Sequence, residues 1–357
     1  MVRLIEYRQL ASILSMFLIV QFAGILLAFS LISPSEVMYT SGTGVSAGAS
    51  SQVIFFFIYL IATALVMVFL FKRHRGPRLF RVIEAVVVVS ASFYLFLIIL
   101  SSLFPDSLTY DIGVSLLAAM LLILAKNKWP GLRNMVAVIA SVGVGFVLGL
   151  YFSFFEAFLL MALIAVYDYV AVFVTKHMVT LGRESVNRNL AFMVGTYDVE
   201  MVPKGYLKAK DAAKISKMFG KTNNKELQKL MKYGGVPMPS FSALGAGDLA
   251  IPLMLAISAY LTYLNYFFSL TIILGASIGL VFAMYVSKRY AIALPAIPPL
   301  FAFSNIAMGL EILVMMPSNW QFYAPLLAAS AAMLLAVFYT AKREGAKNLK
   351  GGRISPI

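Results

Sequence analysis

The 357-residue sequence contains no cysteine and only two histidines, His74 and His177. The absence of cysteine excludes disulfides, thiol catalysis and cysteine-ligated zinc or iron–sulfur sites. Charged residues are also scarce, at 12% of the chain against about 25% in a soluble domain. This composition excludes a soluble globular enzyme, a disordered chain and a fibrous protein. Neither a metal ion nor another cofactor is expected.

Long apolar runs take up most of the chain, which is 61% hydrophobic with a mean hydropathy of +0.89. We therefore predict an all-α polytopic membrane protein, because each run is a candidate for crossing a bilayer as a helix. The fourth run is the shortest. The ten predicted spans are Ala11–Ile32, Val53–Phe71, Val82–Phe104, Ile112–Ala125, Met135–Phe152, Ala157–Val174, Ala243–Leu264, Phe268–Val286, Ile292–Met316 and Phe322–Thr340.

The basic residues give these spans an orientation. If the N-terminus is cytoplasmic, all 29 Lys and Arg fall in the N-terminal segment, in cytoplasmic loops or in the C-terminal tail, as the positive-inside rule requires. Removing the fourth span would break this pattern. We attribute the net charge of +14 to orientation and to contact with anionic lipid rather than to nucleic acid. A multi-pass protein of the cell membrane is expected.

A polar, lysine-rich segment divides the spans into two groups. Its first part, Ala191–Val202, alternates loosely and predicts a strand or hairpin. Its second part, Leu207–Met231, predicts two short amphipathic helices on the inner membrane surface, with a solvated linker as the alternative. The predicted organisation is a six-span bundle over 1–174, a cytoplasmic basic loop over 175–242, the C-terminal spans over 243–340 and a basic cytoplasmic tail over 341–357.

Four acidic residues fall within the predicted spans: Glu84, Asp168, Asp248 and Glu311. A charge at the centre of a bilayer costs at least ~2.5–3.5 kcal/mol on insertion scales, so each acid needs a physical reason. Glu84 is close to the inner edge, where it would reach lipid headgroups or pair with Arg81. Glu311 lies deeper, and we expect a structural pairing with a polar group on a neighbouring helix.

Asp168 and Asp248 differ from the other two because they lie at matching depths. At 1.5 Å per residue they are ~12 Å and ~10 Å from the inner ends of consecutive antiparallel spans. Two carboxyl groups that meet in a medium of low dielectric hold one proton between them at moderate pH. In an aspartic protease the ionised partner takes a proton from water and the protonated partner polarises the scissile carbonyl. A proton-coupled transporter would use the same pair as a relay.

The residues around both acids have distinctive patterns. Tyr167 and Asp168 form a Tyr-Asp pair, and Gly245, Gly247 and Asp248 form the pattern Gly-x-Gly-Asp. The glycines lack side chains, so another backbone can approach closely and the start of the helix is loosened. Either pattern alone has little specificity.

A third element, Leu294–Leu300 with the sequence LPAIPPL, opens the ninth span. Its prolines leave carbonyls without helical partners, which predicts a non-helical segment that lines protein or water. The order of the three elements, a Tyr-Asp pair, Gly-x-Gly-Asp and then a Pro-Ala-Leu-like opening two spans later, is far more specific than each one alone.

With these three motifs the sequence resembles the presenilin and signal-peptide-peptidase type of intramembrane aspartyl protease, of the archaeal or microbial kind. The resemblance covers about the last six spans, and the tenth span departs from the family's nine-span pattern. It implies a presenilin-like bundle of nine to ten helices. Asp168 and Asp248 are its implied catalytic pair. Substrate binding is implied for Tyr167, Gly245, Gly247, Leu294, Pro295, Ala296, Ile297, Pro298, Pro299 and Leu300.

The implied activity is hydrolysis of peptide bonds within transmembrane helices or signal-peptide remnants. The signal-peptide-peptidase branch implies no obligate partner subunit, and the oligomeric state stays open. Either Pro295-Ala296-Ile297 or Pro298-Pro299-Leu300 would fill the Pro-Ala-Leu role. We further predict that unwound substrate adds as a β-strand against Gly234–Phe241 or Leu294–Leu300. In the alternative, the prolines merely start helices.

Two other intramembrane protease chemistries are excluded. A Ser–His pair of the rhomboid type needs a histidine within a span, and both histidines fall in predicted inner loops. A metalloprotease of the site-2 type needs the motif H-E-x-x-H, which the sequence lacks. The transporter remains the main alternative, and a purely structural protein is the next.

Overall fold

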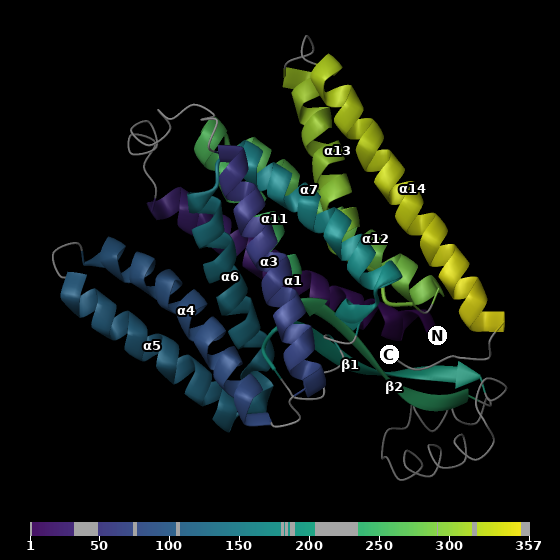
Figure 1. Cartoon of the computed structure of the whole chain (residues 1–357), viewed down its shortest axis with the longest axis horizontal. Helices are drawn as coiled ribbons and strands as arrows, with labels where there is room; N and C mark the ends of the chain where they lie inside the picture. Colours follow the sequence, from purple (N-terminus) through teal and green to yellow (C-terminus); the bar gives the residue numbers. More distant parts are fainter. Residues whose placement is uncertain are drawn as a thin grey trace.

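The computed structural model describes residues 2–31, 49–73, 77–104, 108–179, 182, 185, 190–203, 235–290, 292–315 and 320–350. Within these ranges ten helices are long and apolar enough to cross a membrane (Figure 1). They are α1 (Val2–Leu31), α3 (Ala49–Arg73), α4 (Pro77–Leu103), α5 (Leu108–Lys128), α6 (Arg133–Tyr151), α7 (Phe154–Tyr169), α11 (Ala246–Tyr263), α12 (Tyr266–Tyr290), α13 (Ile297–Met315) and α14 (Trp320–Lys350).

The ten predicted spans therefore correspond one to one with helices, and the all-α polytopic fold is confirmed. The fourth span, predicted as the shortest, lies within the 21-residue helix α5. The last span continues beyond its predicted end at Thr340, because α14 runs on to Lys350. Part of the predicted tail is thus an extension of the tenth helix.

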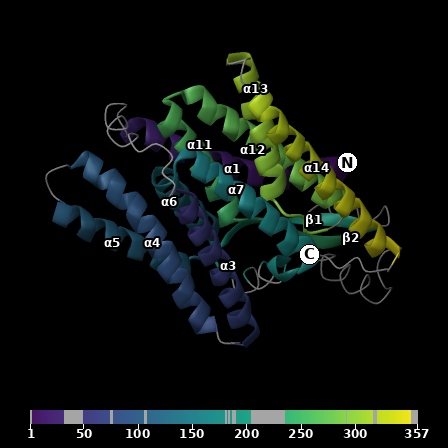
Figure 2. The same cartoon turned by 45° about the horizontal axis from the view of Figure 1, so that its top comes forward.

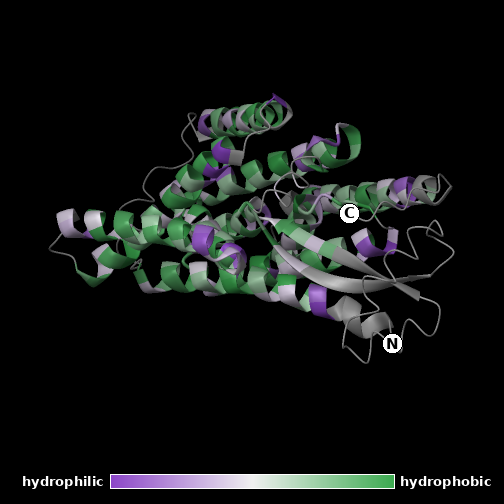
Figure 3. Ribbon diagram, turned by 90° about the horizontal axis from the view of Figure 1, so that it is seen from below, coloured by the Kyte–Doolittle hydropathy of each residue, from purple (hydrophilic) through white to green (hydrophobic). Residues whose placement is uncertain are grey.

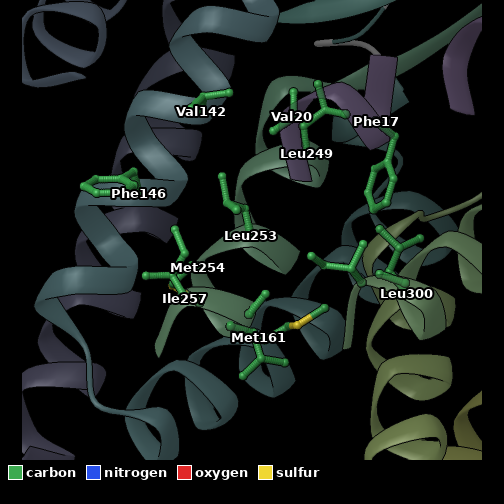
Figure 4. Close-up of a cluster of buried hydrophobic side chains, with 14 of the residues drawn as sticks. Phe17, Val20, Val142, Phe146, Met161, Leu249, Leu253, Met254, Ile257 and Leu300 are labelled. Carbon is green, nitrogen blue, oxygen red and sulfur yellow. The ribbon is translucent and has the colours of Figure 1, made fainter. Parts of the chain in front are cut away.

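Helix α11 occupies the centre of the bundle and packs against α1, α6, α7 and α12. Small residues of α6 allow this helix to approach α11 closely. A Cβ atom built on Gly145 would lie 2.7 Å from the carbonyl oxygen of Ala250, and one built on Gly149 would lie 2.7 Å from Cβ of Ile257. Figure 4 shows the buried side chains that fill this core, among them Phe146, Leu253 and Met161.

The outer helices have apolar surfaces that face away from the core. Hydrophobic residues dominate the ribbon of the bundle (Figure 3). Phe55, Tyr59 and Leu65 of α3 and Leu117 and Leu121 of α5 are exposed. A soluble protein rarely exposes so much contiguous apolar surface, whereas a bilayer covers it. The hairpin of α4 and α5 lies on one side of the bundle and α14 on the other (Figure 1).

A two-stranded antiparallel sheet lies at one end of the bundle in both views (Figure 1; Figure 2). Strand β1 (Met193–Pro203) confirms the strand predicted over Ala191–Val202. It pairs with β2 (Gly235–Gly245), from Met193 opposite Gly245 to Pro203 opposite Gly235. The seventh helix consequently begins at Ala246, three residues later than predicted, because β2 continues to that point. The two helices predicted over Leu207–Met231 lie outside the described residues.

The pairing expected for Glu84 is wrong. Its carboxylate forms a buried ion pair with Lys126 of α5 and accepts the backbone N–H of Ala191 at 2.6 Å. Three segments far apart in the sequence therefore meet at this carboxylate, close to the start of β1. Arg81 was the expected partner of Glu84 because it is one helical turn away in the sequence. In the fold, the packing of α5 against α4 places Lys126 beside Glu84 instead.

Candidate active site

Asp168 lies in the last turn of α7 and is only 6% exposed. At the start of the same helix Glu156 accepts the backbone N–H of Ser153 at 2.8 Å, an N-terminal cap that fixes where the helix begins. After Tyr169 the helix continues as one π-helical turn, Val170–Val174. Such turns are rare and occur frequently at functional sites.

The carboxylate of Asp168 receives a backbone N–H from the start of α13. Oδ2 accepts the N–H of Ile297, the first residue of that helix, at 3.2 Å. The next two residues, Pro298 and Pro299, have no N–H to offer, and the N–H of Leu300 bonds to the carbonyl of Ala296 at 3.3 Å. The prolines thus remove competing donors. Helix α13 presents its N–H and the positive end of its dipole to Asp168.

The structure corrects the prediction for the Leu294–Leu300 segment. Only its first part is non-helical, because α13 begins at Ile297. Pro298 and Pro299 lie in the first turn of the helix, where a missing N–H costs nothing since that group has no intrahelical partner. The alternative considered for these two prolines, that they start a helix, is the observed one.

Asp248 is the third residue of α11, directly after β2. Its Oδ2 accepts the backbone N–H of Gly245 at 3.1 Å, so the carboxylate caps its own helix. A Cβ on Gly245 would lie 3.1 Å from this same oxygen, so a larger residue there would require the carboxylate to shift by a few tenths of an ångström. Pro252, four residues further on, has no N–H for the carbonyl of Asp248.

Gly247 has a different surrounding from the one predicted for it. A Cβ built on this residue would meet nothing within 4 Å, so the close approach predicted for it is not seen on the side where its side chain would lie. Its absent side chain leaves open space beside Asp248 instead. That space belongs to a cavity of about 880 Å³, which Asp168, Gly247 and Asp248 all line.

The cavity brings together elements that are distant in the sequence. Of the residues predicted to bind substrate, four line it: Gly245, Gly247, Leu294 and Ala296. The others predicted in the proline-rich opening are buried behind its wall: Pro295, Ile297, Pro298, Pro299 and Leu300. Phe241–Gly245, from the end of β2, and the non-helical residues Ala293, Leu294 and Ala296 border the space beside the two carboxyl groups.

Several lining residues were not found by sequence reasoning. Among them are Met284, Ser287 and Lys288 from α12, Phe192 just before β1, and Met193 at its start. In the sequence, Lys288 indicated only the cytoplasmic end of the eighth predicted span. No local pattern announces that the eighth helix borders the site, because its position depends on how α12 packs against α13.

Tyr167 is adjacent to Asp168 in the sequence but forms its own hydrogen-bond chain. Its hydroxyl bonds to Nε2 of His177 at 2.9 Å, and Nδ1 of that histidine bonds to Oγ1 of Thr175 at 2.6 Å. Its ring also contacts Phe57 of α3, with centroids 6.4 Å apart. The tyrosine therefore connects the end of α7 to α3 and to the residues after the π turn.

The two carboxyl groups are close enough to interact electrostatically. Each accepts a backbone N–H from a helix start, and both face one cavity. A pair of this kind can hold one shared proton, so that one member serves as base and the other as acid. The fold and this site together define a polytopic helical membrane protein in which two carboxyl groups face one cavity, the arrangement that aspartic-protease chemistry requires.

Comparison with known proteins identifies the family. A sequence model described as signal-peptide peptidase, presenilin aspartyl protease matches residues 14–309. The chain belongs to this family and is an intramembrane aspartic endopeptidase. Helix α14 lies beyond the matched residues.

Solved structures support the same fold. Two structures of a presenilin family intramembrane aspartate protease, in space groups C222 and P2, are similar to this chain. The first is 19% identical in sequence, with a TM-score of 0.51, and the match spans 84% of this chain and 96% of the solved chain. The second is 20% identical in sequence, with a TM-score of 0.53, and the match spans 85% of this chain and 97% of the solved chain. No curated protein matches the chain.

Proposed function

We propose that Asp168 and Asp248 are the catalytic pair of this protease, and that they hydrolyse peptide bonds within transmembrane helices or signal-peptide remnants through an activated water. The observation that carries the proposal is that both carboxyl groups, from helices separated by the long polar segment, line one cavity. A water placed between them would lie within reach of a base and of an acid at once.

The proposed reaction needs one proton and one negative charge on the pair. The ionised carboxylate takes a proton from the water as its oxygen attacks the scissile carbonyl carbon. The protonated carboxyl donates to the carbonyl oxygen, and a gem-diol forms. Proton transfer to the amide nitrogen then breaks the C–N bond and releases a carboxyl and an amine. The backbone N–H groups of Ile297 and Gly245 hold the two carboxylates in place.

The substrate must be unwound before it can react, because a helix sequesters its peptide groups in internal hydrogen bonds. Unwound backbone in a membrane needs new partners, since lipid offers none. We propose that it adds as an extended strand beside Phe241–Gly245 of β2 or beside the non-helical residues Ala293, Leu294 and Ala296, which border the cavity. Gly247 leaves room for a substrate backbone to pass Asp248.

The proposed setting is the cell membrane, with the N-terminus and the 175–242 loop in the cytoplasm. The distribution of the 29 basic residues supports this orientation. We propose that the chain acts on transmembrane peptides without an obligate partner subunit, and that it does not bind nucleic acid. The domain organisation stated above, with one catalytic aspartate on each side of the loop, is part of the proposal.

The test is cleavage of a single-span transmembrane peptide by the purified chain in lipid or detergent, followed by intact mass. In H₂¹⁸O, the new carboxyl group should gain one heavy oxygen. Added hydroxylamine should give no hydroxamate product, because direct attack by water forms no acyl-enzyme. A hydroxamate would contradict the two-carboxylate mechanism. Absence of any cleavage, with proton-coupled uptake into vesicles instead, would favour the transporter alternative, which the comparisons do not support.

A further inference from the structure

Helix α14 has one buried face although most of its surface is exposed. Ser330, Val337, Ala341 and Gly345 are buried, at the helical spacing of one stripe. A helix that served only as an extra membrane anchor would need no such stripe. The buried residues extend over about half of the helix length, and the last two lie in the extension beyond the span predicted from sequence.

The C-terminal part of α14 reaches the helix that carries Asp168. The hydroxyls of Tyr169 and Thr340 are hydrogen-bonded at 2.7 Å, so the residue directly after Asp168 is tied to the tenth helix. One helical turn further on, Glu344 pairs with Lys176 at 3.5 Å. Lys176 has a left-handed backbone, with φ of 56°, which is uncommon for a residue other than glycine. Both contacts lie on one side of α14, because residues four apart share a face.

The same part of α14 also packs against the opposite wall of the site. Ala341 forms a buried cluster with Val286 and Ile292, against which Leu294 of the cavity wall and Phe173 of the π turn are packed. The approach is close at Gly345, where a Cβ would lie 2.9 Å from Cβ of Tyr290. Helix α14 thus touches α7, α12 and the extended segment that leads into α13.

We propose that α14 is a positioning element for the catalytic pair, built into this chain beyond the part that matches the family. It holds the end of α7 against the segment that leads into α13, and so maintains the alignment of Asp168 with its backbone donor, Ile297. The inference rests on the proposed function. Thr340 and Ala341 act through α7 and the cavity wall, and they do not touch substrate.

The first experiment compares Thr340→Val with Thr340→Ser in the full chain. The valine change removes the hydroxyl at nearly constant shape, whereas serine keeps it. Loss of one such hydrogen bond corresponds to about a fivefold effect. For Thr340→Val, kcat for the transmembrane peptide should fall by about that factor while KM stays unchanged. For Thr340→Ser, kcat should stay within about twofold of the unmodified chain. A change confined to KM, or equal rates for both variants, would overturn the inference.

The second experiment uses the absence of native cysteine. Lys176→Cys and Glu344→Cys, joined by a short bis-maleimide, would fix α14 to the end of α7. If α14 stays in place during catalysis, the cross-linked enzyme should cleave at the rate of the uncross-linked double variant. Loss of cleavage on cross-linking would show that α14 must move away, and would contradict the proposal. If the unmodified chain cleaves no peptide at all, the proposed function itself fails, which is distinct from either outcome.

Discussion

Replacing Gly279 by alanine tests how the start of α13 is held against the site. In α12, a Cβ at Gly279 would lie 2.5 Å from the carbonyl oxygen of Pro299 and 2.8 Å from Cα of Leu300. Ordinary contact begins at 3.4 Å, and both obstacles are backbone, so the two helices must separate by close to an ångström. Overpacking of this kind costs about 1–3 kcal/mol of stability.

The separation should act on catalysis more than on folding. Moving Pro299 and Leu300 also moves Ile297, whose N–H already lies 3.2 Å from Oδ2 of Asp168. A displacement of about 1 Å at a reacting group can cost on the order of 10²-fold in rate. We expect kcat for a transmembrane peptide to fall by about 10- to 100-fold, while the protein still unfolds cooperatively on heating.

Gly113→Ala is the matched control for this prediction. Gly113 lies in α5, and a Cβ there would meet nothing within 4 Å. Alanine at this position should leave cleavage unchanged, and the better helix propensity should raise stability by a few tenths of a kcal/mol or more. If Gly279→Ala is folded and cleaves at the normal rate, the proposed link between α12, the start of α13 and Asp168 is wrong.

Three further predictions concern pH, the ion pair and the substrate. Cleavage should decline at high pH, where the shared proton is lost, and at low pH, where the base is protonated; a flat profile between about pH 4 and 9 would contradict acid–base work by the pair. Lys126→Met should lower the free energy of unfolding by about 3–5 kcal/mol, because it leaves Glu84 buried without its cation, and an unchanged melting temperature would refute this. Helix-destabilising residues near the scissile bond of a substrate should raise its cleavage rate, whereas equal rates for a rigid poly-Leu peptide would exclude the unwinding step.

Much of the fold follows from the sequence because the membrane imposes simple rules. The lengths of the apolar runs define the spans. The fourth span is needed as well, because without it the basic residues after it would fall on the outer side of the membrane. The near-equal depths of Asp168 and Asp248 follow from the helical rise alone. Their placement on one cavity wall agrees with that depth.

The remaining features depend on tertiary contacts that no local pattern encodes. Proline is compatible both with extended chain and with the first turn of a helix, so the prolines alone do not decide that α13 begins at Ile297, whose N–H bonds to Asp168. The Glu84–Lys126 pair requires α4 beside α5. The contact of Thr340 with Tyr169 joins residues 171 positions apart. The sequence of an apolar tenth span does not reveal whether the helix also positions the site.

The catalytic role of the two aspartates is tested most directly by measuring cleavage with Asp168→Asn and Asp248→Asn, with Glu311→Gln as the control. An asparagine carbonyl oxygen can still accept the N–H of Ile297 or Gly245, so both variants should stay folded. Glu311 lies within α13 and does not line the cavity with the pair. We expect no detectable product from either asparagine variant and normal cleavage by the glutamine variant. Near-normal turnover by either asparagine variant, confirmed by product mass, would contradict it.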